Sequence, residues 1–124
     1  KDNNILITTG LIKLELIEHL INKYFKKDNS NIYSYKKNGK SIYLVNKPSF
    51  DDIESLLRNS KVLISCHGAI THAANSFNVK IIDIIEKSNS SFYNKFTSYI
   101  NNYFPVYRND FTKIIEYLRK GINE

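Results

Sequence analysis

The sequence predicts an α/β fold, a single Rossmann-like parallel sheet, doubly wound, with helices on both faces. Three observations predict this class. Short apolar runs alternate along the chain with segments of helical periodicity. Two of these runs, Val62–Ser65 and Val79–Ile85, are almost continuously apolar, as strands are when helices cover both faces of a parallel sheet. The length of 124 residues suits one domain, which we place over residues 1–124.

The first half of the chain is expected to contain two or three strands. A strand is predicted at Asn4–Thr8 and a helix at Ile12–Phe25, where apolar residues recur at intervals of three and four. Ile32–Tyr35 and Ile42–Val45 both have the composition of strands. The Asn-Gly pair at 38 and 39 is a strong turn signal, so the pattern leaves open whether these two strands pair as a hairpin.

The second half continues the alternation. Ser49 is the expected N-cap of a helix with Asp51 and Asp52 in its first turn. Its inward side is expected to carry Phe50, Ile53, Leu56 and Leu57. The later elements are expected in the order strand Val62–Ser65, turn at Cys66–Gly68, helix Ile70–Phe77, strand Val79–Ile85, helix Ser90–Tyr103, extended segment Pro105–Tyr107 and a last helix capped by Asp110.

Composition restricts the functional class. The net charge is +6, but the basic residues are scattered rather than gathered with stacking aromatics, so we expect no nucleic-acid partner. An anionic substrate or a peripheral contact with an acidic membrane surface is the expected use of this charge. The single cysteine, Cys66, excludes an internal disulfide and is compatible with a cytoplasmic location. The chain opens at Lys1 and soon enters a strand, so we expect a piece of a longer protein.

The turn after the Val62 strand is the candidate site. His67 and His72 flank it, and they are the only histidines outside the first predicted helix. In open parallel sheets ligands bind at the carboxyl ends of strands, where the first turn of the next helix offers N–H groups to an anion. A ligand site is therefore expected here.

Residues in this region resemble known glycosyltransferases. The run from His72 to Ile84, HAANSFNVKIIDI, resembles the "HLAAALGVPVVALF" run of the heptosyltransferase-like family (glycosyltransferase family 9). In that family the run follows a strand and a turn of the form "S-x-D-T/G-G-x-x-H". The sequence departs from that turn: His67 stands where the family has an acid, Ala69 replaces its second Gly, and Lys80 replaces its Pro. His67-Gly68-Ala69 also resembles, more weakly, the "HGAG" turn of glycosyltransferase family 61.

This resemblance implies a donor-binding domain, the C-terminal half of a GT-B fold. The partners that it implies are a nucleotide sugar, a glycan or lipid-linked acceptor of a bacterial surface polysaccharide or glycolipid, and a missing N-terminal domain. The enzymatic base commonly comes from that missing domain, so the chain alone is expected to bind rather than to catalyse. We assign no catalytic residue, no metal ligand and no cofactor. The residues expected to bind the donor are Thr9, Gly10, His67, Gly68, Ala69, Ile70, Thr71, His72 and Glu86.

Each of these positions has a physical reason. Gly68 permits close backbone approach, and the amides of Ala69, Ile70 and Thr71 begin a helix. Thr71 and His72 can add donors to a diphosphate. Thr9 and Gly10 follow the first strand and are expected in the same crevice, and Glu86 follows the Val79 strand, where it can accept ribose hydroxyls.

Other interpretations remain open at this point. The chain can be a non-catalytic domain that binds a nucleotide sugar or a partner, or a domain like that of polysaccharide pyruvyl transferases, which an Arg in place of Cys66 would favour. His72 can be a core histidine bonded to a backbone carbonyl, and His67 can cap the turn. Asp83 interrupts an apolar strand, so it is either buried with a hydrogen-bond partner or at the sheet edge.

Overall fold

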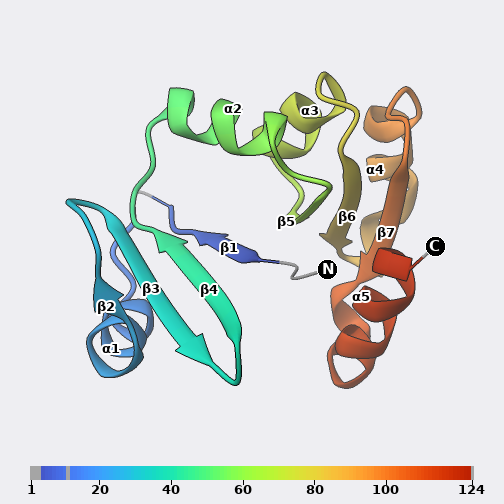
Figure 1. The fold of residues 1–124 in the computed structure, drawn as a ribbon. Helices are drawn as coiled ribbons and strands as arrows, with labels where there is room; N and C mark the ends of the chain where they lie inside the picture. Colours follow the sequence, from blue (N-terminus) through green and yellow to red (C-terminus); the bar gives the residue numbers. More distant parts are fainter. Residues whose placement is uncertain (1–3, 11, 124) are drawn as a thin grey trace. The chain divides into compact units, whose positions relative to one another are not determined.

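The computed structural model describes residues 4–10 and 12–123, and the chain divides into two compact units, residues 1–53 and 54–124. Each unit is described by itself. The described part of the N-terminal unit contains four strands, one complete helix and the start of a second (Figure 1). Its elements are β1 (Ile5–Thr8), α1 (Glu15–Tyr24), β2 (Lys26–Lys27), β3 (Ile32–Lys37) and β4 (Lys40–Val45).

The N-terminal unit is built on a mixed sheet in the order β1-β4-β3-β2. β1 pairs with β4 in parallel, whereas β3 and β4 form an antiparallel hairpin. Only Asn38 and Gly39 separate its paired ends, with φ angles of 51° and 74°. Two positive φ angles in a two-residue loop are the signature of a type I′ turn, which matches the twist of the flanking strands. The hairpin that the sequence pattern left open therefore forms.

The C-terminal unit contains a purely parallel sheet in the order β5-β6-β7. Leu63 pairs with Ile81 and Asp83 pairs with Pro105. Its elements are β5 (Val62–Cys66), α3 (Ala69–Asn75), β6 (Lys80–Ile85), a 3₁₀ turn (Lys87–Asn89), α4 (Ser90–Thr97), β7 (Tyr103–Tyr107), a second 3₁₀ segment (Arg108–Lys113) and α5 (Ile114–Asn123).

The expectation of one doubly wound sheet is therefore wrong, although the α/β class is confirmed. The expected parallel pairs form, β1 with β4 and β5 with β6, but they belong to two different sheets. The physical reason in the first half is the two-residue loop between β3 and β4. A parallel connection needs a crossover of a dozen or more residues, so these neighbours must pair antiparallel.

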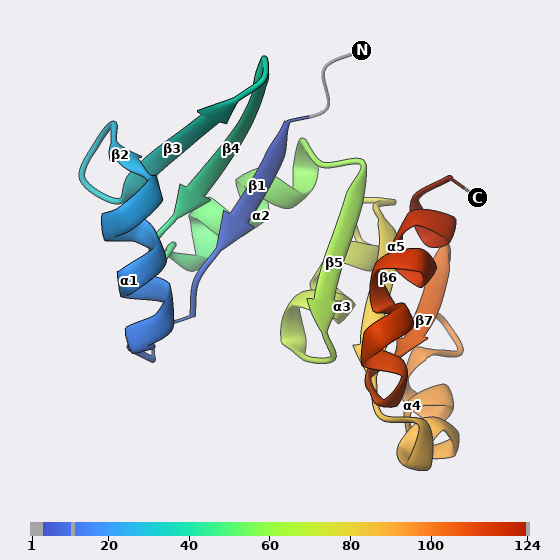
Figure 2. The same ribbon diagram turned by 90° about the horizontal axis from the view of Figure 1, so that it is seen from below.

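Both faces of β6 are covered. Ile82 is fully buried and packs with Val106, and the side chains packed against this pair include Val62, Ile84, Phe104 and Leu118 of α5. Figure 2 shows α5 lying against β6 and β7. Because side chains alternate along a strand, Ile81 and Asp83 point to the opposite face, and both are fully buried. The central strand of this sheet is thus covered on both faces, as its apolar sequence predicted.

The end of the Ser90 helix also differs from expectation. α4 stops at Thr97, and Tyr103 begins β7 instead of ending the helix. Asn102, just before this strand, adopts a positive φ of 54°, which a continuing helix cannot contain. Pro105 lies inside β7, and this position is allowed because β7 is an edge strand. α5 begins at Ile114, and the expected capping side chain of Asp110 lies outside the part that the structure describes.

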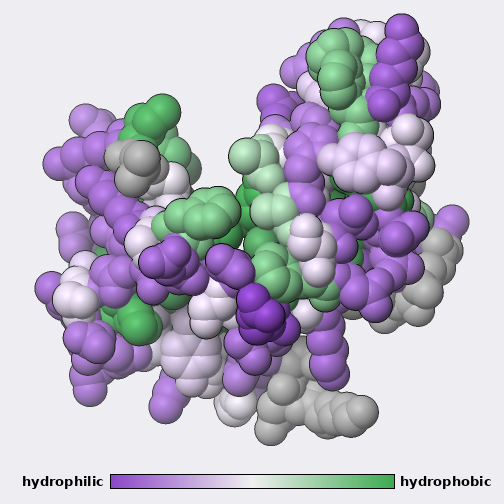
Figure 3. Space-filling model, turned by 90° about the horizontal axis from the view of Figure 1, so that it is seen from above, coloured by the Kyte–Doolittle hydropathy of each residue, from purple (hydrophilic) through white to green (hydrophobic). Residues whose placement is uncertain are grey.

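Several large apolar side chains reach the surface. Phe92, Phe96 and Tyr99, on α4 and just after it, are about half exposed or more, so the aromatic residues of this segment are not all core. Hydrophobic groups are visible among hydrophilic ones on the face shown in Figure 3. Within residues 4–10 and 12–123, no helix has both the length and the apolar character needed to cross a bilayer.

The helix α2 (Phe50–Arg58) begins with a reciprocal cap, as its sequence predicted. The Asp52 amide donates to Ser49 Oγ at 3.1 Å, and the Ser49 amide donates to Asp52 Oδ2 at 2.9 Å. These bonds form a capping box, with Asp in the place of the usual Glu. Leu57 is buried as expected, but Phe50 is 71% exposed, so it does not face inward.

We expect Asp52→Asn to destabilise the protein at neutral pH but not in acid. The backbone and side-chain hydrogen bonds from Ser49 lower the pKa of Asp52 below its ordinary value of 3.8. A lowered pKa stabilises the fold above 3.8, and this contribution disappears as the pH falls through the folded value. Urea unfolding followed by circular dichroism at pH 7 and in strong acid measures the difference. Asp51→Asn is the matched control, and an equal, pH-independent loss in both variants would contradict the capping role.

Candidate functional site

The candidate site lies at the carboxyl edge of the C-terminal sheet. His67 follows β5, Glu86 follows β6 and Arg108 follows β7. The carboxyl ends of parallel strands meet at one edge, so the three residues belong to the same end of this sheet.

A buried carboxylate connects His67 to the middle of the sheet. His67 Nδ1 lies 2.6 Å from Oδ2 of Asp83, and the Tyr103 hydroxyl donates to the same oxygen at 2.9 Å. Asp83 pairs with Ser65 in the sheet register, and His67 lies two residues after Ser65, just beyond the end of β5. Of the two alternatives for Asp83, burial with a hydrogen-bond partner is confirmed.

Asp83 has unusually few partners for a buried acid. It is fully buried on the central strand, and its Oδ1 is the one buried side-chain nitrogen or oxygen in the described residues without a hydrogen-bond partner. A buried carboxyl group without enough partners is costly. His67 and Tyr103 are therefore the two side chains that satisfy this carboxyl group, and both of them bond to Oδ2.

Tyr103 acts as a donor to Asp83 across a wide pH range. Burial raises the pKa of its hydroxyl well above the ordinary value of 10, and the hydrogen bond and charge of Asp83 raise it further. The phenol consequently keeps its proton at any physiological pH. Tyr103 thus occupies one acceptor position of Asp83 Oδ2 permanently.

The two histidines lie against each other and against two tyrosines. Their ring centroids are 5.2 Å apart in an edge-on arrangement, and the Tyr93 ring lies 4.8 Å from that of His67. His72 Nδ1 is 2.5 Å from the Tyr99 hydroxyl, and the two rings are nearly parallel. The partner of His72 is thus a side-chain hydroxyl and not a backbone carbonyl. In both histidines Nδ1 is occupied, which leaves Nε2 as the nitrogen for a ligand.

The turn before α3 offers fewer anion donors than the sequence suggested. The Thr71 amide already donates to the Gly68 carbonyl at 3.0 Å, and the fully buried Thr71 hydroxyl lies 3.2 Å from that of Ser65. Thr71 is therefore internal structure. The Ala69 and Ile70 amides begin α3, and no hydrogen bond of theirs is found in the described part of the chain.

Gly68 is not required by local geometry. Its φ and ψ angles of 174° and −170° describe extended backbone, which any residue adopts. A Cβ atom there would approach nothing nearer than the Cys66 carbonyl oxygen at 3.9 Å, an ordinary contact. The open space beside Gly68 is consistent with close approach of a ligand.

The remaining residues that the sequence assigned to the site are Glu86, Thr9 and Gly10. Glu86 is half exposed, and one of its oxygens lies 3.7 Å from a guanidinium nitrogen of Arg108. Arg108 also donates to the Cys66 sulfur at 3.6 Å. Thr9 and Gly10 belong to the N-terminal unit, where the Thr9 hydroxyl donates to Asn46 at 2.7 Å and accepts from the Lys47 amide at 2.8 Å. Thr9 therefore links the end of β1 to the residues after β4.

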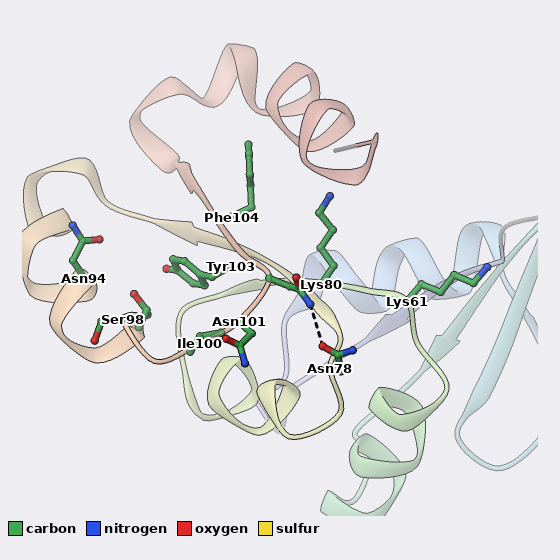
Figure 4. A pocket seen from close by; sticks show the side chains of 11 residues that line it. Lys61, Asn78, Lys80, Asn94, Ser98, Ile100, Asn101, Tyr103 and Phe104 are labelled. Atoms are coloured by element: carbon green, nitrogen blue, oxygen red, sulfur yellow. Dashed lines mark hydrogen bonds between the residues drawn. The ribbon is translucent and has the colours of Figure 1, made fainter.

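A separate cavity of the C-terminal unit does not coincide with this site. It has a volume of about 1020 Å³ and lies at the amino ends of the strands, where Lys61 precedes β5, Lys80 begins β6 and Tyr103 begins β7. Figure 4 shows that its side chains do not converge: Lys61 points away from Asn94 and Ser98, on the far side of the hollow. A specific pocket needs a few convergent polar groups, so we place the site at the carboxyl edge instead.

Metal chemistry finds no support in the side chains. Within the described residues, no group of three or more His, Cys, Asp and Glu side chains is placed to hold an ion.

Comparison with known proteins finds no family model and no curated protein that matches this sequence. The assignment of function therefore depends on the geometry and on the residues themselves.

Sequence reasoning missed four residues of the site: Tyr93, Tyr99, Tyr103 and Arg108. Tyr93, Tyr99 and Tyr103 fall within the helix expected at Ser90–Tyr103, where nothing in the local sequence marked them as site residues. The signal that was available is Asp83, since a carboxylate inside an apolar strand demands donors from neighbouring elements. Which residues supply them depends on strand register, and register was not fixed by the local sequence.

Proposed function

We propose that the C-terminal unit, residues 54–124, is the nucleotide-sugar donor-binding domain of a glycosyltransferase that builds a surface polysaccharide or glycolipid. The observation that carries the proposal is the pair of histidines at the carboxyl edge of a parallel sheet. Each has Nδ1 engaged and Nε2 left for a ligand. Such an edge is where open α/β sheets bind nucleotides.

The charge of this edge supports a diphosphate. Arg108 and Lys87 follow the ends of β7 and β6, and the Arg108 side chain is 52% exposed. Glu86 pairs with this guanidinium and orients it, while its own exposed oxygens can accept ribose hydroxyls. The resemblance of His67–Ile84 to donor-binding turns of glycosyltransferases agrees with this chemistry.

A titration tests the proposal directly. Uridine, cytidine, guanosine and adenosine diphosphates are added in turn to the 124-residue chain, and amide chemical shifts are followed by NMR. We expect one of them to shift the amides of residues 67–72 and 86, with weak affinity. Shifts confined to residues 113–120 would indicate non-specific attraction to basic residues and would contradict the proposal.

Gly68→Val supplies the matched variant for this titration. The extended backbone and open space at Gly68 accommodate valine, so the fold is expected to persist, whereas the side chain blocks approach of the diphosphate. Loss of the amide shifts is the expected result. His19→Ala, which removes an exposed histidine in the N-terminal unit, is the control and should leave them unchanged.

A further inference from the structure

We propose that His67 is the general base of the sugar transfer, acting through Nε2, and that Asp83 is its positioning residue. This inference rests on the proposed function and adds to it a catalytic residue within the chain. No evident base was found in the sequence, because Asp83 is hidden in an apolar strand and His67 follows a different one.

The hydrogen bond to Asp83 determines the tautomer of His67. With the carboxylate 2.6 Å from Nδ1, the imidazole places its proton on Nδ1 and leaves a lone pair on Nε2. The Tyr103 hydroxyl also donates to this oxygen, so Asp83 Oδ2 accepts hydrogen bonds from both side chains. The pair therefore has the orientation in which an acid holds a histidine base in other enzymes.

Packing fixes the ring as well as the proton. Asp83 is fully buried on the central strand, and the His67 ring contacts both the Tyr93 and His72 rings in edge-on arrangements. The His67 side chain keeps 17% of its surface exposed, so the ring is not sealed from solvent. None of the described residues bonds to its Nε2, and this atom is not among the buried atoms without partners.

The proposed step needs no reactant other than the nucleotide sugar and the acceptor. The hydroxyl of the acceptor gives its proton to His67 Nε2, while its oxygen forms a bond to the anomeric carbon of the donor. The bond between that carbon and the diphosphate oxygen breaks, and the nucleoside diphosphate leaves with the electron pair. His67 then returns its proton to solvent.

The first test reads the tautomer and needs no activity. Two-bond ¹H–¹⁵N spectra of the 124-residue chain distinguish a protonated from an unprotonated ring nitrogen. We expect His67 to carry its proton on Nδ1 and to change tautomer in Asp83→Asn, with His72 unaffected. A proton on Nε2 in the wild-type chain, or no change in a folded Asp83→Asn, would overturn the inference. If Asp83→Asn does not fold, Tyr103→Phe keeps the carboxylate, and the Nδ1–H form should persist there.

The second test separates the base from the binding site. The wild-type chain, with water as the acceptor, should release nucleoside diphosphate from the nucleotide sugar that it binds. His67→Gln should lower this release by about 10²–10⁴-fold, the range for a lost general base, while diphosphate binding stays near wild type. If the wild-type chain binds the donor without releasing diphosphate, or if His67→Gln releases it equally fast, the role of His67 as base is overturned, whereas the proposed function is not. Absence of any diphosphate binding would instead overturn the proposed function.

Discussion

His67→Ala is expected to lower the free energy of unfolding by about 3 kcal/mol, a large loss for one partly exposed side chain. The reason is the group that the substitution leaves behind. Asp83 is fully buried, and its Oδ1 already has no partner in the described structure, so removal of His67 leaves only the Tyr103 hydroxyl. Removing one partner of a buried carboxylate costs more than the hydrogen bond itself contributes, because the remaining charge is no longer compensated.

A double-mutant cycle with Asp83→Asn measures that cause. In the Asp83→Asn background no buried charge remains, so the same His67→Ala substitution should cost only about 1 kcal/mol, the typical effect of one hydrogen bond. Urea unfolding of the four proteins gives the coupling. His72→Ala is the control, since its Tyr99 partner is 57% exposed and can be solvated by water. Equal losses for His67→Ala in both backgrounds would show that Asp83 is not a buried charge.

The local structure of this chain was largely predictable from its sequence. The capping box at Ser49 and Asp52 is formed by residues three positions apart, and the hairpin turn at Asn38 and Gly39 depends on two residues that tolerate positive φ. The positions of β1, β3, β4, β5 and β6 followed from apolar runs, whereas the short β2 was not expected. In each case the interactions that decide the structure join residues close in sequence.

The division into two sheets was not predictable in the same way. The apolar runs of β1 and β5 are similar, and nothing in either run specifies which strand it joins. The short loop between β3 and β4 forces these two strands to pair antiparallel. This local feature also has a consequence for the rest of the sheet, since β1 then pairs at the other edge of β4. Strand composition therefore gave the right pairs of parallel neighbours but the wrong number of sheets.

The candidate site shows the same distinction. His67 and His72 were found because they flank one turn, and the structure brings their rings together. Asp83 and Tyr103 lie 16 and 36 positions beyond His67 by residue number, and the pairing of distant strands brings Asp83 to His67 and Tyr103 to Asp83. Thr71 shows a different outcome, since its residue type suggested ligand contact while its amide and hydroxyl are bonded internally.

The other large effect is expected in the core, where two isoleucines offer a matched comparison. Ile64 and Ile82 are direct partners in the parallel pairing of β5 with β6. Ile82 is fully buried beside Val106, whereas Ile64 is 44% exposed. Ile82→Ala is expected to lower the free energy of unfolding by about 2–5 kcal/mol, because it removes buried methyl groups and leaves a cavity. Ile64→Ala should cost about 1 kcal/mol, since much of that side chain is in water already.

Urea unfolding compares the two variants, and amide hydrogen exchange shows where the loss is felt. Ile82 belongs to the C-terminal unit, so exchange should accelerate in β5, β6 and β7. The β3–β4 hairpin lies in the other compact unit, and its amides should keep their protection if the two units open separately. Equal destabilisation by Ile64→Ala would contradict the exposed edge position of β5. Uniform acceleration throughout both units would instead show that the two sheets unfold as one cooperative structure, because only shared opening transmits a cavity in one sheet to the amides of the other.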